Sequence, residues 1–239
     1  YGVASEANIF NMATIYKYSD TIKCLDMIAD RHKKGNSPSI VSMSFSRSKD
    51  SERVYEDVVK ALEQVGVLLF ASAGNESNDV EQHPRYPSSY PQVISVGCTS
   101  KDKGVTSYSN YGKGVDLFAP GHHGLCADTS SDTATRKSSG TSASTPLSAG
   151  VCAVLLEGSR KPESKQDVDV VKKAFFNHAT VDYDPKLEYD PTNIFGTRYD
   201  IDFPELMLRV DLNYDSVILE PPEKKEKQEP EKEKKEEEV

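Results

Sequence analysis

Ser142 is the residue whose position best suits covalent chemistry. It follows a glycine-rich turn and opens a helical pattern in the segment 139–150 (SGTSASTPLSAG). A helix N-terminus gathers unpaired N–H groups and a partial positive charge, so an oxyanion formed by attack of the serine on a carbonyl would be stabilised there. Gly140 allows close approach of a substrate backbone, and Pro146 is expected in the first turn of the helix. The alternative interpretation is a simple helix N-cap at Ser142.

Asn75 is a second residue that suits the same chemistry. It follows Gly74 and the almost wholly apolar segment 67–73, which indicates a strand buried on both faces. A side-chain amide at the end of such a strand can donate a hydrogen bond to a developing oxyanion. The alternative is a loop asparagine, a residue type that tolerates turn conformations.

The elements that must position these side chains alternate along the chain. Short apolar runs indicate strands of a parallel sheet, and apolar residues three to four apart indicate amphipathic helices. Ser51 is an expected N-cap, and Gly35 is an expected helix stop. The predicted fold class is α/β, a doubly wound and mostly parallel sheet with helices on both faces. The expected strands are 7–16, 40–45, 67–73, 93–97 and 115–118, and the expected helices are 20–34, 51–66, 142–157 and 163–177.

The remaining segments lack such patterns. Glycine- and serine-rich loops are expected up to residue 139, a surface loop over 178–204 and a short helix over 203–210. Segment 213–239 is rich in Glu, Lys and Pro, and it cannot bury enough apolar area to offset the entropy of ordering. The chain is therefore predicted to form one domain over 1–212, followed by a disordered tail.

Composition excludes several functional classes. The net charge is −9 without a basic stripe, which argues against binding to nucleic acid. No apolar run is long enough to span a membrane. The four cysteines are far apart in sequence, so a zinc site is not expected. They are interpreted as free thiols or, in a secreted protein, as containing a disulfide whose pairing stays open.

Four segments occur in a fixed order: 40–45 (IVSMSF), 69–76 (LFASAGNE), 85–121 with the stretches RYPSSYPQVISVG, YSNYG and APG, and 139–150. Together they resemble the subtilisin-like serine proteases, the subtilase superfamily, and the likeness spans 2–156. The resemblance implies a subtilisin-like fold and a serine endopeptidase that forms an acyl-enzyme on Ser142. It also implies that Asn75 is the side-chain donor of the oxyanion hole.

The resemblance further implies which residues contact a substrate. Segment 44–46 (SFS) stands where this family has a segment that pairs with substrate backbone and lines the pocket for the residue before the cut. Ser46 and Arg47 replace the glycines usual there, so the family's preference for large apolar residues is not carried over. The implied substrate-binding residues are Ser44, Phe45, Ser46, Ala73, Gly74, Gly140 and Thr141.

The base that would activate Ser142 is expected outside these 239 residues. In the family, Asp and His precede Ser, and the His precedes a stretch like segment 2–7 (GVASEA). The first strands of the sheet are therefore expected to be missing, and the chain alone is expected to be inactive and to aggregate through an unpaired edge. The alternative function is a catalytically inactive subtilase-like binding module. The histidines present lack the family context; they are His32, which stands at a helix C-terminus where a cation is favoured, His83, His122, His123 and His178.

The resemblance also sets expectations about cofactors, partners and location. No cofactor is required, but structural calcium is an expectation, because loop 86–93 resembles one that holds a weak cation in the family. The expected partner is a protein or peptide substrate. The full-length protein is expected to be a monomer in the secretory pathway.

Overall fold

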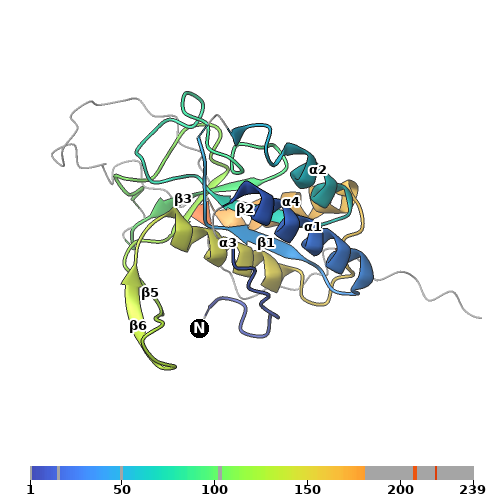
Figure 1. Ribbon diagram of the computed structural model, residues 1–239. Coiled ribbons are helices and arrows are strands. Elements are labelled where there is room, and N and C mark those ends of the chain that lie inside the picture. The colour runs from blue at the N-terminus through green and yellow to red at the C-terminus, as the bar shows by residue number, and fades with distance from the viewer. Residues whose placement is uncertain are drawn as a thin grey trace, which may run out of the picture.

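The computed structural model describes residues 2–14, 17–48, 51–101, 104–180, 207–208 and 219. Its centre is a sheet in the order β1-β2-β3-β4-β8-β7, in which only the pairing of β7 with β8 is antiparallel (Figure 1). The predicted α/β class with a mostly parallel sheet is confirmed. The strands are β1 (Ile40–Met43), β2 (Leu68–Ser72), β3 (Ile94–Thr99), β4 (Leu117–Pro120), β7 (Ala179–Thr180) and β8 (Met207–Leu208).

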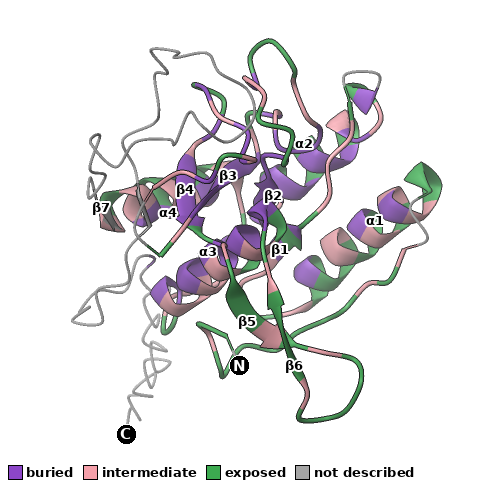
Figure 2. Cartoon of the chain, turned by 90° about the vertical axis from the view of Figure 1, so that its left-hand side faces the viewer, coloured by how far each residue is buried: buried purple, intermediate pink, exposed green. Residues whose placement is uncertain are grey.

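Helices cover both faces of this sheet, as the doubly wound pattern requires (Figures 1 and 2). β2 shows why its sequence has no polar alternation: all five of its residues are buried. Leu68 and Phe70 pack in the core beneath α3 and α4, whereas Leu69 and Ala71 pack in the core beneath α1 and α2. The helices are α1 (Tyr18–Lys34), α2 (Glu56–Gln64), α3 (Thr141–Leu155) and α4 (Lys165–His178).

The first two helices differ from the sequence expectation mainly at their starts. α1 ends at the predicted stop, with Gly35 as its C-cap. α2 begins at Glu56, and Ser51 lies in the turn before it. Ser51 is buried, and its hydroxyl shares a 2.8 Å hydrogen bond with the Tyr18 hydroxyl. The N-cap prediction for Ser51 is therefore wrong. Its side chain bonds to Tyr18 on α1, and so it ties the turn before α2 to α1 instead of capping a helix.

The predicted strand over 7–16 does not form in the described residues 7–14. Ile9 is 85% exposed and Phe10 is 59% exposed, so this apolar pattern is not buried. A strand needs a partner for its backbone groups, and in the described part of the chain β1 is the edge of the sheet and pairs only with β2. Aggregation through this edge stays a prediction, supported by the exposed apolar side chains.

Two further segments depart from the predicted loops and helix. The expected loop before residue 139 contains a two-stranded antiparallel hairpin, β5 (Gly124–Ala127) with β6 (Thr135–Ser138). Both strands are largely exposed, so no hydrophobic alternation marks them in sequence. Within the expected helix 203–210, the two described residues form β8. Most of the expected loop 178–204 lies outside the described residues.

The predicted tail 213–239 lies outside the described residues except for Leu219. Leu219 is buried in the core beneath α3 and α4, and its carbonyl accepts a hydrogen bond from Arg160 N at 3.1 Å. This residue therefore belongs to the packed part of the molecule, although it falls within the expected tail.

The surface and the cysteines bear on the other compositional expectations. All four cysteines are free, and burial raises the pKa of the Cys152 thiol to about 12.

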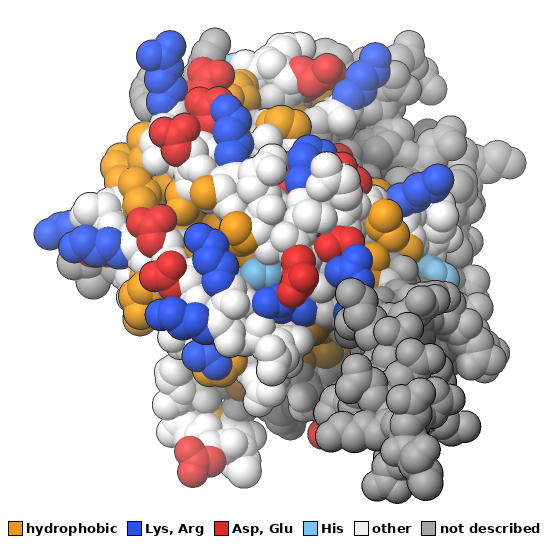
Figure 3. Space-filling view, turned by 90° about the vertical axis from the view of Figure 1, so that its right-hand side faces the viewer, with side chains coloured by type: hydrophobic (Ala, Val, Ile, Leu, Met, Phe, Trp, Pro, Cys, Tyr) orange, Lys and Arg blue, Asp and Glu red, His pale blue; other side chains and the backbone are white. Residues whose placement is uncertain are grey.

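Among the described helices, none combines the length and apolar character that a membrane span requires. Lys and Arg side chains alternate with Asp and Glu over the face drawn in Figure 3. The absence of nucleic-acid binding stays a prediction.

His32 is buried at the end of α1, a position at which the helix dipole favours a cation. It is only 2% exposed, and Nε2 lies 2.9 Å from Pro162 O. Since a carbonyl can only accept, Nε2 carries the proton, and Nδ1 has no partner in the described structure. Burial lowers the pKa of His32 below its ordinary value, so the ring is held neutral rather than serving as a helix-end cation.

The free energy of unfolding of the full-length protein is expected to fall as pH drops below about 6.5. The unfolded chain then takes up a proton on His32 before the folded chain does, and the loss continues until the lowered folded pKa is reached. Urea denaturation at about pH 7.5 and about pH 5.5 measures it. His32→Gln, which can still donate to Pro162 O, should show less of this loss, whereas the exposed His83→Gln should behave as wild type. Equal losses in all three proteins would contradict the assignment.

Candidate active site

Ser142 lies at the N-terminus of α3, beside the segment that leaves β1. Its side chain is exposed, and its hydroxyl donates to Ser44 O at 3.4 Å. Gly140 is the N-cap and Thr141 the first residue of the helix, and Ser142 caps no backbone N–H. The N-cap interpretation of Ser142 is therefore wrong, and its hydroxyl stays available at the positive end of the helix dipole.

Pro146 explains how the end of β1 is joined to α3. It lies inside the helix beyond the first turn, so the first-turn prediction is wrong. Without an N–H, Pro146 cannot donate to the carbonyl of Ser142, four residues earlier. That carbonyl instead accepts a hydrogen bond from Ser44 Oγ at 2.8 Å. The proline thus frees an acceptor that fastens the expected substrate segment to the helix carrying Ser142.

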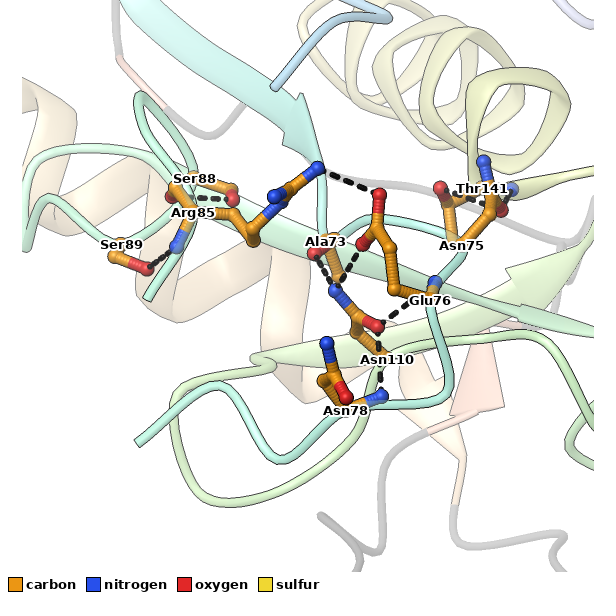
Figure 4. Close-up of polar contacts among 9 residues, drawn as sticks. All are labelled: Ala73, Asn75, Glu76, Asn78, Arg85, Ser88, Ser89, Asn110 and Thr141. Atoms are coloured by element: carbon orange, nitrogen blue, oxygen red, sulfur yellow. Dashed lines mark hydrogen bonds and ion pairs between the residues drawn. The ribbon is translucent and has the colours of Figure 1, made fainter. Parts of the chain in front are cut away.

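Asn75 lies against the same helix end, with its amide oriented by Thr141. Thr141 N and Oγ1 both donate to Asn75 Oδ1, at 2.9 and 3.1 Å (Figure 4). The backbone donor fixes which end of the amide is oxygen. Nδ2 has no hydrogen-bond partner in the described part of the chain, and it is therefore left as a donor. The φ angle of Asn75 is not positive, so tolerance of a turn conformation does not explain this residue.

The loop that carries Asn75 is anchored by Asn110, whose role cannot be read from the YSNYG stretch alone. Asn110 is fully buried. Its Oδ1 accepts from the N–H groups of Glu76 and Asn78, at 3.1 and 2.9 Å. Its Nδ2 donates to Ala73 O and to Glu76 Oε2, both at 2.8 Å (Figure 4). One side chain therefore fixes the backbone on both sides of Asn75, which makes Asn110 a positioning residue.

Asn110→Ala is expected to lower the free energy of unfolding by about 2–4 kcal/mol, because it leaves buried backbone groups without partners. If Asn75 acts in catalysis, kcat should also fall at least about tenfold with little change in KM, since a displaced donor weakens the transition state. Urea denaturation and peptide hydrolysis by the full-length protein measure both effects.

Asn78→Ala is the matched control, because it keeps the backbone N–H that Asn110 accepts. It should resemble wild type in both measurements. An Asn110→Ala protein with unchanged kcat would contradict the positioning role.

Gly74 and Gly140 are glycines for steric reasons at this site. Gly74 has φ +110°, and a β-carbon there would lie 2.3 Å from Asn110 Nδ2. Gly140 has φ +133°, and a β-carbon there would lie 3.4 Å from both Nδ2 and Oδ1 of Asn75. Any other residue would therefore strain the backbone at both positions, and at Gly74 it would also clash with the Asn110 amide.

Two backbone segments form the walls of the expected substrate groove. β1 and β2 pair in parallel, so the segments that follow them leave the same edge of the sheet. We call residues 44–46 the first wall and residues 73–75 the second wall. The ring of Phe45 packs edge-on against Tyr55 with centroids 6.1 Å apart, so its backbone rather than its ring is left to contact a substrate.

Two of the expected substrate-binding residues serve mainly to hold others. Ala73 is buried, and its N–H donates to Val96 O on β3 at 3.0 Å. Thr141 is fully buried, and its hydroxyl donates to Asn75. The structure brings all the predicted site residues to one end of the sheet, and their roles stay predictions.

No histidine supplies a base to Ser142 in the described structure, because the hydrogen bonds of Ser142 run only to Ser44. His122 lies on the loop after β4, where Nδ1 is 3.0 Å from the Tyr108 hydroxyl. That hydroxyl lies 3.4 Å from Cys98 Sγ, and burial raises the pKa of Tyr108 to about 12. His122 is thus engaged in a separate polar chain behind the site.

Four of the carbonyls in loop 86–93 already accept hydrogen bonds. The carbonyls of Tyr86, Pro87 and Tyr90 already accept backbone N–H groups. Gln92 O accepts from the ammonium of Lys172 at 2.7 Å, so a positive charge already occupies that carbonyl. Among the described residues, no cluster of three or more acidic, His or Cys side chains could hold a metal ion. Structural calcium, in this loop or elsewhere in the protein, stays a prediction.

Several known proteases resemble this chain in sequence or in structure. Proteinase R of Parengyodontium album is 33% identical over 161 residues, and alkaline protease 1 of Aspergillus clavatus is 34% identical over 172. These alignments cover 65% and 68% of this chain but 41% of each relative, so the chain spans less than half their length. The crystal structure of a cold-adapted subtilisin-like serine proteinase superposes with a TM-score of 0.54 at 30% identity, covering 66% of this chain and 56% of that one.

A second solved structure supports the fold alone. The prenylagaramide maturation protease PagA has a TM-score of 0.62 at 22% identity, covering 84% of this chain and 68% of that protein. The family model of the subtilases, Peptidase_S8, matches residues 1–197. Because that match covers most of the chain, the protein belongs to the subtilase family.

Proposed function

We propose that the full-length protein is a serine endopeptidase that cleaves peptide bonds through an acyl-enzyme on Ser142. The observation that carries this proposal is the pairing of two groups at one helix end. Ser142 presents its hydroxyl there, and Thr141 turns the Asn75 amide so that Nδ2 is left to donate. A nucleophile and an oxyanion donor are the two parts of acyl transfer that a rigid scaffold must hold together.

The proposed reaction follows from these groups. Ser142 Oγ attacks the peptide carbonyl, and the oxyanion accepts hydrogen bonds from Asn75 Nδ2 and Ser142 N–H. The serine proton passes to a histidine and then to the leaving amine, and water hydrolyses the acyl-enzyme by the reverse proton path. We place the histidine and its aspartate on a segment of the full-length protein that precedes Tyr1, since no described histidine contacts Ser142.

Labelling with a fluorophosphonate tests this function, because the reagent forms a covalent bond only with an activated serine. In the full-length protein, the label is expected on Ser142, as located by peptide mass spectrometry. A folded full-length protein without label at Ser142 would overturn the proposal and favour the inactive binding module.

We also propose that the full-length protein is a monomer of the secretory pathway that acts on protein or peptide substrates. The family membership and the protease relatives support this proposal. Recovery of the full-length protein from the culture medium tests the location, and retention inside the cells that produce it would contradict it. Size-exclusion chromatography of the recovered protein tests the oligomeric state, and elution at twice the monomer mass or more would contradict a monomer.

A further inference from the structure

Arg85 lies beside the first wall of the expected substrate groove. The residue after that wall, Arg47, exchanges two backbone hydrogen bonds with Tyr86, at 2.8 and 2.9 Å. This short antiparallel bridge places the neighbouring Arg85 beside the first wall. Glu76 directly follows the second wall. The backbones of Arg85 and Glu76 therefore lie on opposite sides of the expected groove.

The side chains of Arg85 and Glu76 meet across that space. Arg85 Nη2 lies 2.6 Å from Glu76 Oε1, and Glu76 Oε2 accepts from Asn110 Nδ2 at 2.8 Å. Because Asn110 is fully buried and fixed, it fixes the carboxylate, and the carboxylate in turn fixes the guanidinium. Figure 4 shows Glu76 between Arg85 and Asn75, so the ion pair lies next to the expected oxyanion donor.

The guanidinium of Arg85 has donor capacity to spare. Nε is buried and has no hydrogen-bond partner in the described structure, although the side chain as a whole is 23% exposed. Because Nε is shielded from solvent, an entering acceptor would pair with the exposed part of the guanidinium, where Nη1 has no hydrogen-bond partner in the described structure. The planar fork of arginine suits carboxylate and amide oxygens.

We propose that Arg85, held by Glu76, closes this end of the groove and selects substrates by the residue before the cleaved bond. That residue should carry an acidic or amide side chain, Glu or Gln above all, whose oxygen accepts from the guanidinium. A large aromatic ring would cover the guanidinium without offering it an acceptor. Glu76 neutralises part of the arginine charge, so Gln is accepted beside Glu. This specificity rests on the proposed peptidase function.

The test compares kcat/KM of the full-length protein for peptides that differ only in the residue before the cut: Glu, Gln, Phe or Lys. Wild type should prefer Glu and Gln over Phe and Lys by at least about tenfold. Arg85→Met keeps the length of the side chain and removes its donors, so the preference for Gln over Phe should fall at least about tenfold. Glu76→Gln leaves the guanidinium uncompensated, so the ratio of Glu to Gln should rise by about tenfold.

Lys165→Met is the matched control, because it removes a lysine from an ion pair with Asp169 on the solvent-exposed side of α4. All ratios should stay as in wild type. If Arg85→Met does not fold, Glu76→Gln decides the outcome. A wild-type preference for Phe, or ratios unchanged in both groove variants, would overturn the specificity while Ser142 still takes up the fluorophosphonate. Absence of label in wild type would instead overturn the peptidase function, and the specificity with it.

Discussion

Ser142→Ala in the full-length protein is expected to lower kcat for a peptide substrate on the order of a million-fold. Without the hydroxyl no acyl-enzyme can form, so fluorophosphonate labelling should also disappear. The free energy of unfolding should change by less than about 0.5 kcal/mol, because the exposed hydroxyl makes only one long hydrogen bond, at 3.4 Å to Ser44 O. Peptide hydrolysis, mass spectrometry of labelled protein and urea denaturation measure the three quantities.

The control for Ser142→Ala is Ser131→Ala, an exposed serine between the strands of the β5–β6 hairpin. It should keep both activity and labelling. Labelling that persists in Ser142→Ala would show that another residue is the nucleophile. A large loss of stability would instead assign Ser142 a structural role that its exposure does not suggest.

Asn75→Ala is expected to lower kcat by about 100- to 1000-fold with KM nearly unchanged, as is typical when one oxyanion donor is removed. The reason is geometric: Thr141 holds Oδ1 at 2.9 and 3.1 Å, so Nδ2 is the group left to donate. Charge develops on the substrate oxygen only in the transition state, so binding of the ground state should be spared. Steady-state kinetics with a peptide substrate separates the two constants.

Thr141→Val provides a graded comparison. It keeps the backbone N–H to Asn75 Oδ1 and removes only the hydroxyl donor, so a loss of kcat nearer to tenfold is expected. If Asn75→Ala raises KM and leaves kcat intact, Asn75 contacts the substrate in its ground state and is not an oxyanion donor.

The parts of the fold that sequence predicts are those buried on both sides. β2 and β3 appear as apolar runs because every one of their residues is buried, and α1 shows its stop at Gly35. The exposed β5–β6 hairpin has no such pattern, because it is held mainly by backbone pairing and not by burial of apolar side chains. Residues 7–14 show the converse: an apolar pattern stays exposed when no neighbouring strand is present to pair with it.

At the site, short-range motifs point to the two proposed reactive residues but not to the residues that hold them in place. Ser142 and Asn75 stand in recognisable segments of the sequence. Asn110 acts on the loop of Asn75 from over 30 residues away, and Arg85, which meets Glu76, is next to the residue that pairs with Arg47. Such contacts form between segments that only the tertiary fold brings together, so local sequence patterns do not predict them.

α3 contacts β1, β2, β3 and β4, all of which precede it in the chain. Until this helix and α4 have been made and docked, the face of the sheet that holds Phe70 has no cover. Parallel pairing between distant segments is also slow to form. On the proposed function, the order of synthesis would delay reactivity: the helix that bears Ser142 can complete its contacts only after all four of these strands have been made.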